Sequence, residues 1–479
     1  MSGAATSTRR STAWVVGEYA GLQVLRFSSN LVLWRLLSEE TFGVMALVNV
    51  YLQAVEMFSD VGIGPSIVQS KRGSERAFLD TAWTVQCVRG VLLGLVACIA
   101  AYPLARFYEV PELVWYVPVA GLTSILHGFD STKIFEAQRN LDYARFTIMG
   151  LVTQTVTAVA MVAWAWLSPS VWALVGGTLA GVFLRTLLSH VWLRGERNRF
   201  RLDRAALTEL IHFGRWMFIS TLLTFVAIHS DRLIFGKLVT LEELGVYSVA
   251  VIWALLPAAF VGQLIGRITF PLLALAHQAG QPLGPTFRRA RLPVVLLSGY
   301  LSSCIFAGGP ALIELLYPPT VADAGWILQL LTIGCWFAGL EAVNAVALMS
   351  IGEPKYLAIA NGAKVAGMAV LLPLGFHLAG FPGAILGFVL PDVAKYLVSL
   401  IPLFRKKASV LGPDIGLTLV VASVSAVGTL VHHALENAHP FVEGLAIFVV
   451  VSGVWGGLAF ALRDRLRGLR RSLPPAEAS

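Results

Sequence analysis

Long apolar segments follow one another along almost the whole of this 479-residue chain. Each is about twenty or more residues long, which is the length of helix that crosses the hydrocarbon core of a bilayer. The segments lie near residues 13–37, 42–68, 80–105, 112–136, 143–167, 170–193, 210–238, 244–272, 292–316, 324–350, 355–378, 381–403, 414–433 and 441–462. This pattern predicts an all-α polytopic membrane protein with about 14 transmembrane helices.

Composition supports the same fold class. Hydrophobic residues make up 56% of the chain, charged residues only 13%, and the mean hydropathy is +0.73, well outside the balance of a soluble globular protein. Arg9 and Arg10 lead directly into a span of full membrane length, so we expect no cleavable signal peptide. The four cysteines fall within apolar spans without metal-ligand spacing, and neither a disulfide nor a metal site is predicted.

Two short segments repeat one pattern at a constant offset. Arg35–Val44 and Lys237–Val246 each show a basic residue, a leucine, an apolar residue, a hydroxyl residue, an acidic turn, and then glycine and valine. In both, an apolar helix ends in a short acidic loop and a second apolar helix begins at the glycine. The duplication predicts six-helix lobes over 1–200 and 205–405, followed over 406–479 by two peripheral helices and a basic tail.

The loops between spans differ in charge. Lysine and arginine gather on the cytoplasmic side of membrane proteins. With the N-terminus inside, the inner segments are strongly basic, whereas the outer turns carry Glu39–Glu40, Glu109, Glu112 and Glu242–Glu243. Both termini and the 194–204 linker are therefore predicted to be cytoplasmic.

Ionisable residues also occur inside the spans, where a charge at the bilayer centre costs at least about 2.5 kcal/mol. Polar residues of the second span recur on one helical face, at Asn49, Gln53, Glu56 and Asp60. Other spans carry similar pairs, among them Gln23 with Arg26, Gln86 with Arg89, His127 with Asp130, Glu341 with Asn344, Asn361 with Lys364, and Asp392 with Lys395. Such charges are expected to face each other or water.

Two interpretations of these charges remain open. Pairs one turn apart, such as Asp130 with Lys133 or Asp392 with Lys395, are suited to structural salt bridges. A hydrated cavity between two six-helix halves explains more of the set, because packing seldom needs a polar stripe on most of twelve helices. Duplicated halves with charges near mid-membrane are typical of secondary transporters.

Several function classes are disfavoured. The chain has no Walker-type phosphate loop, nucleotide-binding domain or metal-ligand cluster, so we predict that it is not an enzyme, needs no cofactor or metal and binds no nucleic acid. Membrane polysaccharide polymerases and ligases carry a large external loop with catalytic residues, and the predicted outer loops here are short.

The repeated segments resemble those of the multidrug/oligosaccharidyl-lipid/polysaccharide exporter superfamily, most closely its Wzx-type polysaccharide flippases. Arg35–Gly43 is similar to a family hairpin, with Glu39 where the family has proline. Phe58–Gly64 is similar to an Asp-x-Gly-x-Gly segment. Further matches are Ser230-Asp231-Arg232, the turn at Leu244–Tyr247, and Arg267 before Phe270-Pro271. The resemblance covers roughly residues 12–405.

The resemblance implies a flippase that moves a polyprenyl-pyrophosphate-linked oligosaccharide repeat unit across the bacterial inner membrane by alternating access, for lipopolysaccharide or exopolysaccharide biosynthesis. It implies as partners the lipid-linked oligosaccharide, membrane lipids, and the polysaccharide polymerase and chain-length machinery. In related flippases the last two helices form a lipid groove. The first alternative is an ion-coupled drug or small-molecule exporter of the same superfamily, and the second is a membrane polysaccharide polymerase or ligase.

For such a substrate the cations within spans are candidate binding residues, because arginine's planar fork can hold two phosphate oxygens. They are Arg26, Arg89, Lys133, Arg215, Arg232, Arg267 and Lys364. The acids within spans are candidate ion-coupling residues, because two acids one turn apart disfavour simultaneous ionisation. They are Glu56, Asp60, Asp130, Glu341 and Asp392.

Overall fold

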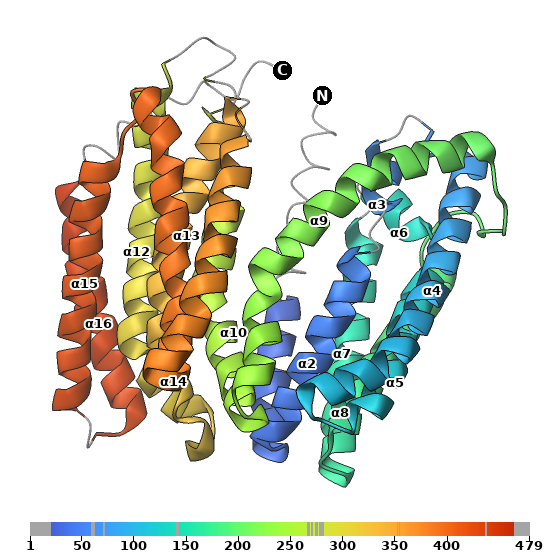
Figure 1. Ribbon diagram of the computed structural model, residues 1–479, viewed down its shortest axis with the longest axis horizontal. Helices are drawn as coiled ribbons and strands as arrows, with labels where there is room; N and C mark the ends of the chain where they lie inside the picture. The colour runs from blue at the N-terminus through green and yellow to red at the C-terminus, as the bar shows by residue number, and fades with distance from the viewer. Residues whose placement is uncertain are drawn as a thin grey trace. The chain divides into compact units, whose positions relative to one another are not determined.

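A computed structural model of the chain describes residues 21–58, 63–69, 72–139, 143–265, 269, 272–273, 276, 282–351, 353, 355–435 and 438–463. All regular structure within these ranges is helical (Figure 1). Nine of the helices in these ranges are long and apolar enough to cross a membrane. The predicted fold class, an all-α multi-pass membrane protein, is confirmed, whereas the count of fourteen transmembrane helices stays a prediction.

The chain divides into two compact units, with the boundary between Gly245 and Val246. In the first unit residues 21–36 are helical, and the helices after them are α2 (Glu39–Phe58), α3 (Ile63–Gln69), α4 (Arg76–Tyr108), α5 (Leu113–Gly128), α6 (Lys133–Arg139), α7 (Tyr143–Leu167), α8 (Val171–Val191) and α9 (Arg204–Leu238). Helix α9 packs on α2, α3 and α4. The lobe boundaries predicted from the duplication stay a prediction.

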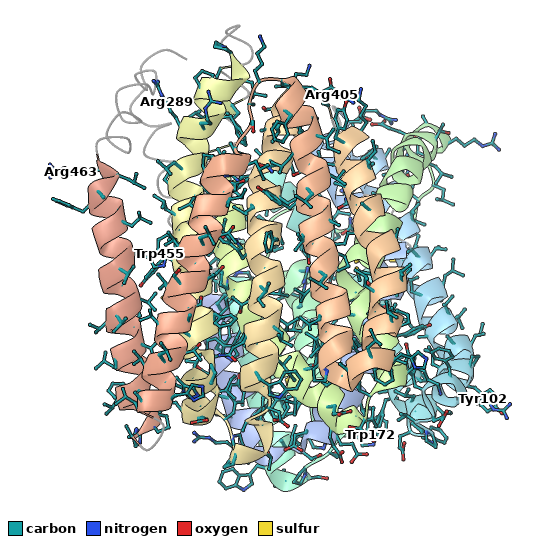
Figure 2. The ribbon with its side chains drawn as sticks, turned by 60° about the vertical axis from the view of Figure 1, so that its left-hand side comes forward. Tyr102, Trp172, Arg289, Arg405, Trp455 and Arg463 are labelled. Carbon is teal, nitrogen blue, oxygen red and sulfur yellow. The ribbon has the colours of Figure 1, made fainter. Side chains whose placement is uncertain are left out.

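The second unit contains most of α10 (Leu241–Leu264) together with α12 (Leu283–Leu316), the short 3-10 helix η2 (Pro319–Val321), α13 (Ala324–Ser350), α14 (Lys355–Arg405), α15 (Leu411–Ala434) and α16 (Pro440–Ala461). Helix α12 packs against α13 and also against α15 and α16. One apolar cluster around Phe287, Trp336 and Leu400 joins α12, α13 and α14. A second, around Val424 and Trp455, joins α15 and α16 to α12 (Figure 2).

Helix α14 consists of two arms that meet at a sharp bend. Ala379 and Gly380 have non-helical backbone angles, and Gly380 has a φ of 62°, a conformation that glycine adopts without steric cost. Near the bend, a Cβ at Gly375 would overlap the carbonyl of Gly383, and a Cβ at Gly383 would overlap that of Gly375. The arms correspond to the two spans predicted over 355–378 and 381–403.

The helix predicted over 112–136 is wrong as a continuous element. Helix α5 ends at Gly128, and α6 begins only at Lys133. The side chain of Gln86 on α4 donates hydrogen bonds to the backbone carbonyls of His127 (2.8 Å) and Asp130 (3.2 Å). In a continuous helix these carbonyls would accept backbone N–H groups one turn further on. The predicted span over 42–68 is likewise covered by two helices, α2 and α3, separated by residues outside the described ranges.

The two repeated hairpins contact each other within the first unit. A Cβ at Gly43 would overlap the carbonyl of Leu241, and a Cβ at Gly245 would overlap the carbonyl of Glu39. Nearby, Lys237 Nζ lies 2.5 Å from Glu109 Oε1, which joins the ends of α9 and α4. The acidic turns predicted to be outer thus gather at one end of this unit.

The basic linker before α9 follows the opposite end of α4. The backbone N–H groups of Arg199, Arg201 and Asp203 donate hydrogen bonds of 3.0, 3.0 and 2.9 Å. Their acceptors are the side chains of Asp80, Thr84 and Thr81, respectively, near the N-terminus of α4. Arg76 at that end also pairs with Glu196 of the linker. The segments predicted to be inner therefore also gather together in this unit.

Candidate functional site

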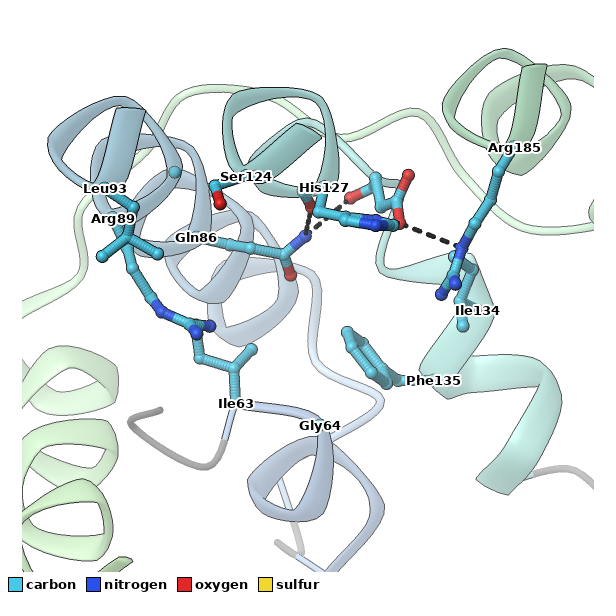
Figure 3. A pocket seen from close by; sticks show the side chains of 13 residues that line it. Ile63, Gly64, Gln86, Arg89, Leu93, Ser124, His127, Ile134, Phe135 and Arg185 are labelled. Atoms are coloured by element: carbon cyan, nitrogen blue, oxygen red, sulfur yellow. Dashed lines mark hydrogen bonds and ion pairs between the residues drawn. The ribbon is translucent and has the colours of Figure 1, made fainter. Parts of the chain in front are cut away.

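The first unit contains a polar cavity of about 410 Å³. Residues from α3, α4, α5, α6 and α8 contribute to its lining, which includes Ile63, Gly64, Gln86, Arg89, Leu93, Ser124, His127, Asp130, Ile134, Phe135 and Arg185. Figure 3 shows the side chains of Arg89, Gln86 and Phe135 extending toward the same space. Hydrogen-bonding and charged groups thus line a cavity among helices whose other faces expose apolar residues such as Val88, Leu92 and Phe183.

Asp130 is the one acid among the described lining residues, and several neighbours contact its carboxylate. Arg185 Nε of α8 lies 3.3 Å from Oδ2, and His127 Nδ1 of α5 lies 3.2 Å from the same oxygen. The hydroxyl of Thr186 donates to Oδ1 at 2.8 Å. These contacts orient a buried carboxylate that lies in the break between α5 and α6.

Lys133 lies close to Asp130 in sequence but makes a different contact. Its ammonium donates a hydrogen bond of 2.8 Å to the carbonyl of His190, near the C-terminus of α8. A cation is favoured there because the last carbonyls of a helix carry partial negative charge. The break after α5 separates Lys133 from the carboxylate, so the pairing of Asp130 with Lys133 considered above is replaced by the contact with Arg185.

The second unit holds two ion pairs, one between the two arms of α14 and one between α13 and the second arm of α14. Lys364 Nζ lies 2.8 Å from Asp392 Oδ1, and Lys395 Nζ lies 2.9 Å from Glu341 Oε2. Both acids are buried. The pairing of Asp392 with Lys395 considered above is thus replaced by two pairs that link different helical segments.

Other predicted site residues are more scattered. Arg26 is exposed on the helix at 21–36, and Arg232 lies 3.4 Å from His229 Nδ1 on its own helix, α9. Glu56 lies in α2 and Arg215 in α9, but their side chains lie outside the described part of the structure. Asp60 and Arg267 lie outside the described residues altogether.

One buried polar cluster was not predicted from the sequence. Both Nη atoms of Arg291 on α12 donate hydrogen bonds to the carboxylate of Asp414 on α15, and the bond from Nη2 is 2.9 Å long. The hydroxyl of Tyr396 on α14 donates a third hydrogen bond, of 2.5 Å, to Asp414 Oδ2. Arg291 lies near the N-terminus of α12 and Asp414 in the first turn of α15, outside the polar stripes identified in the sequence. The sequence signal for this cluster was Asp414 itself, an acid in the first turn of an apolar span.

The second unit also has an apolar groove of about 450 Å³ between α12 and α16. Its lining residues are Pro293, Leu296, Leu297, Tyr300, Ser452, Trp455, Gly456 and Ala459. The Trp455 indole donates to Ser303 Oγ at 3.3 Å, and the Tyr300 hydroxyl lies 3.1 Å from Ser452 Oγ. Because these polar atoms have partners, the groove presents a mostly apolar surface.

Comparisons with known proteins agree with this architecture. A family model described as "Polysaccharide biosynthesis protein" matches residues 32–319. The chain is 24% identical over 274 residues to the amylovoran biosynthesis protein AmsL of Erwinia amylovora, covering 56% of this chain and 70% of that protein. It is 22% identical over 386 residues to the lipopolysaccharide biosynthesis protein WzxC of Escherichia coli K12, covering 77% and 75% of the two chains.

A solved structure shows the same fold. The lipid II flippase MurJ, in an inward closed conformation, superposes with a TM-score of 0.67 at 12% sequence identity. The match covers 92% of this chain and 99% of that structure. At this identity the likeness describes the arrangement of helices alone.

Proposed function

This chain belongs to the polysaccharide biosynthesis protein family, and we propose that it moves a polyprenyl-pyrophosphate-linked oligosaccharide from the inner to the outer leaflet of the bacterial cytoplasmic membrane. In this proposal the lobes 1–200 and 205–405 alternate in access, while 406–479 adds two peripheral helices and a tail. The polysaccharide polymerase and chain-length machinery receive the product. No bond of the substrate is made or broken by the chain itself.

The observation that carries the proposal is the cavity of the first unit. Among the described lining residues, the arginines Arg89 and Arg185 outnumber the one carboxylate, that of Asp130. Ionised groups inside a membrane protein are costly unless they face a partner, water or a polar substrate. A cavity whose described side chains carry more positive than negative charge favours an anionic substrate that forms hydrogen bonds.

The position of each candidate cation relative to the cavity suggests its role. Arg89 lines the cavity, and its guanidinium can hold two oxygens of one pyrophosphate. Lys133 and Lys364 are engaged by His190 and Asp392, which favours structural or switching roles for them. Arg26, Arg215, Arg232 and Arg267 remain proposed contacts for the headgroup at other stages of transport.

The groove between α12 and α16 is suited to the lipid part of the same substrate. A polyprenyl chain is a flexible hydrocarbon, and the groove is lined mostly by apolar side chains. The charged headgroup and the apolar tail of one lipid-linked glycan would then each have a matching surface. A water-soluble drug would leave the groove without a function, so the exporter alternative explains fewer of the observations.

The acids are proposed as the ion-coupling residues. Asp130, Glu341 and Asp392 each lie within 3.3 Å of a nitrogen of a basic side chain. Protonation of one such carboxylate would remove its attraction for the cation and release that cation toward the substrate. Glu56 and Asp60 complete the proposed set. Replacing both Glu56 and Asp60 by the matching amides should remove any dependence of flipping on the proton gradient while the protein still folds, and unchanged gradient dependence would contradict their role.

The test is transport by the purified chain in proteoliposomes that contain a synthetic polyprenyl-pyrophosphate oligosaccharide. Flipping is scored as the appearance of the glycan in the leaflet accessible to an added glycosidase. Arg89→Ala and Arg215→Ala are expected to lose flipping, and Arg→Lys at either site should retain part of it. Arg106→Ala is the matched control, because Arg106 is an exposed arginine of the same helix, α4. Unchanged flipping by both alanine variants would contradict the proposed mechanism.

A further inference from the structure

The cavity of the first unit contains a hydrogen-bond acceptor, Gln86 Oε1, that an ionised phosphate group cannot satisfy. We propose that this cavity binds a sugar ring of the lipid-linked glycan, held by Gln86, Ser124 and Phe135, while Arg89 serves the neighbouring pyrophosphate. This inference rests on the proposed function and specifies which part of the substrate enters the cavity.

Gln86 shows what kind of ligand is required. Its amide nitrogen donates to the carbonyls of His127 and Asp130 at 2.8 and 3.2 Å, so the orientation of the amide is determined by two acceptors. The amide oxygen must then point the other way. Gln86 is only 8% exposed, and its Oε1 has no hydrogen-bond partner in the described part of the protein. A ligand that satisfies this oxygen has to donate a hydrogen bond.

Ser124 adds a second hydrogen-bonding atom to the same lining. It comes from α5, is 3% exposed, and its Oγ has no partner among the described residues. A buried polar atom without a partner costs about 1–3 kcal/mol. A sugar hydroxyl both donates and accepts, and so satisfies a serine hydroxyl and a glutamine oxygen equally well. An ionised pyrophosphate only accepts.

Phe135 supplies an apolar face beside these polar atoms. Its ring comes from α6 and lines the cavity (Figure 3). Gly64 on α3 leaves the space for it, because a Cβ at Gly64 would lie 2.7 Å from Phe135 Cε1. The face of an aromatic ring is partly negative, which favours the weakly positive C–H groups on one face of a sugar. An aromatic face next to hydrogen-bonding groups is therefore complementary to a pyranose.

Two other occupants fit the cavity less well. A metal cation is disfavoured because Arg89 and Arg185 line the cavity, and the carboxylate of Asp130 is already engaged by Arg185, His127 and Thr186. The cavity of roughly 410 Å³ has room for several waters, but waters leave the aromatic face of Phe135 without a complementary partner, whereas a sugar ring matches both that face and the polar atoms. The volume and the chemistry together favour a polyhydroxylated ring.

Photo-crosslinking in membranes of the strain that makes the polysaccharide tests this assignment. A photoreactive amino acid is introduced at Ile134 or Leu93, two apolar lining residues, and at Phe183 as a control on the exposed face of α8. The captured lipid-linked glycan is treated with mild acid, which cleaves the bond between sugar and pyrophosphate. We expect the protein to keep the glycan mass at Ile134 and Leu93 but not at Phe183. An adduct that keeps only prenyl phosphate at both positions would overturn the assignment.

Substitutions separate recognition from folding. Because Ser124 Oγ has no partner among the described residues, Ser124→Ala should not lower the melting temperature of the purified protein but should reduce glycan capture at Leu93 about five- to tenfold. Phe135→Leu keeps an apolar side chain without an aromatic face and should reduce capture similarly. Phe183→Leu is the matched control and should not change it. Full capture in both cavity variants contradicts the proposal.

The outcomes distinguish this inference from the function on which it rests. If proteoliposomes flip the synthetic lipid-linked glycan but no cavity position captures sugar, the sugar site is wrong and the flippase function stands. If flipping is absent and no position captures glycan, the proposed function fails and the sugar site fails with it.

Discussion

Lys364 and Asp392 form an ion pair of 2.8 Å between the two arms of α14. Both side chains are largely buried, at 14% and 8% exposure. Breaking a buried pair leaves one charge without compensation, which is far more costly than removing both charges together. The pair is therefore suited to holding the two arms of α14 together, and its loss would allow the arms to separate.

Lys364→Met is expected to lower the free energy of unfolding of the detergent-solubilised protein by about 3–5 kcal/mol, because Asp392 is left buried and unpaired. The double variant Lys364→Met/Asp392→Leu should recover most of that loss. Thermal or denaturant unfolding monitored by fluorescence measures both. Equal destabilisation in the single and double variants would show that the charge pair is not responsible.

Tyr396→Phe is expected to destabilise the second unit by about 1–3 kcal/mol, because Asp414 loses a buried hydrogen bond. The effect should be accompanied by faster proteolysis of the 406–440 segment, since Asp414 joins α15 to α12 and α14. Tyr102→Phe, at an exposed tyrosine of α4, is the control. Lowered stability without faster proteolysis of this segment would show that the Tyr396 hydroxyl does not act by holding α15 in place.

Acidification should weaken the contact between the ends of α4 and α9. The hydrogen bond from the Lys237 ammonium, followed by its charge, holds the pKa of Glu109 below its ordinary value. A depressed carboxyl pKa contributes stability that is present above the unfolded-state pKa and is lost as the pH falls through the folded-state value. Melting temperature measured against pH should show a smaller acid-side decrease in Glu109→Gln than in Glu112→Gln. An identical decrease would rule out this contribution.

Cysteines introduced at Glu40 and Glu243 should react with a membrane-impermeant reagent from outside the cell, and a cysteine at Arg199 should not. All three positions are exposed in the protein, so differences in labelling report the side of the membrane rather than burial. Permeabilised cells provide the control, in which all three should label. The reverse pattern in intact cells would overturn the predicted topology.

The linker should tolerate changes of side chain better than changes of backbone. Arg199 and Arg201 contact α4 through their backbone N–H groups. Arg199→Ala and Arg201→Ala should therefore keep the melting temperature, whereas Arg199→Pro and Arg201→Pro remove a donor and should lower it. Equal melting temperatures in the alanine and proline variants would show that these hydrogen bonds contribute little.

Hydrophobic length predicted most of the helices, because span length reflects the membrane rather than tertiary contacts. The span predicted at 324–350 coincides with α13. The break between α5 and α6 depends on Gln86, which comes from a helix some forty residues earlier, and no local pattern reports it. Composition likewise does not predict the left-handed conformation of Gly380, which lies at the bend of α14.

The sequence identified candidate site residues, whose roles stay a prediction, but it did not predict most of their contacts. Asp130, Glu341 and Asp392 were identified by their cost within a span, which is a property of the residue. Their partners Arg185, Lys395 and Lys364 depend on the rotation and depth of neighbouring helices. Spacing along one helix predicted the contact of His127 with Asp130, but the lysine and arginine partners of these three acids come from other helical segments.

The two hairpin glycines bear on the ancestry of the chain. Gly43 approaches Leu241, and Gly245 approaches Glu39, so each contact is the other with the two repeats exchanged. Self-complementary contacts of this kind are what a symmetric homodimer makes. A half-length gene product with one such hairpin would carry both halves of the contact on a single surface. Fusion of two gene copies would have preserved that contact while freeing each copy to diverge elsewhere.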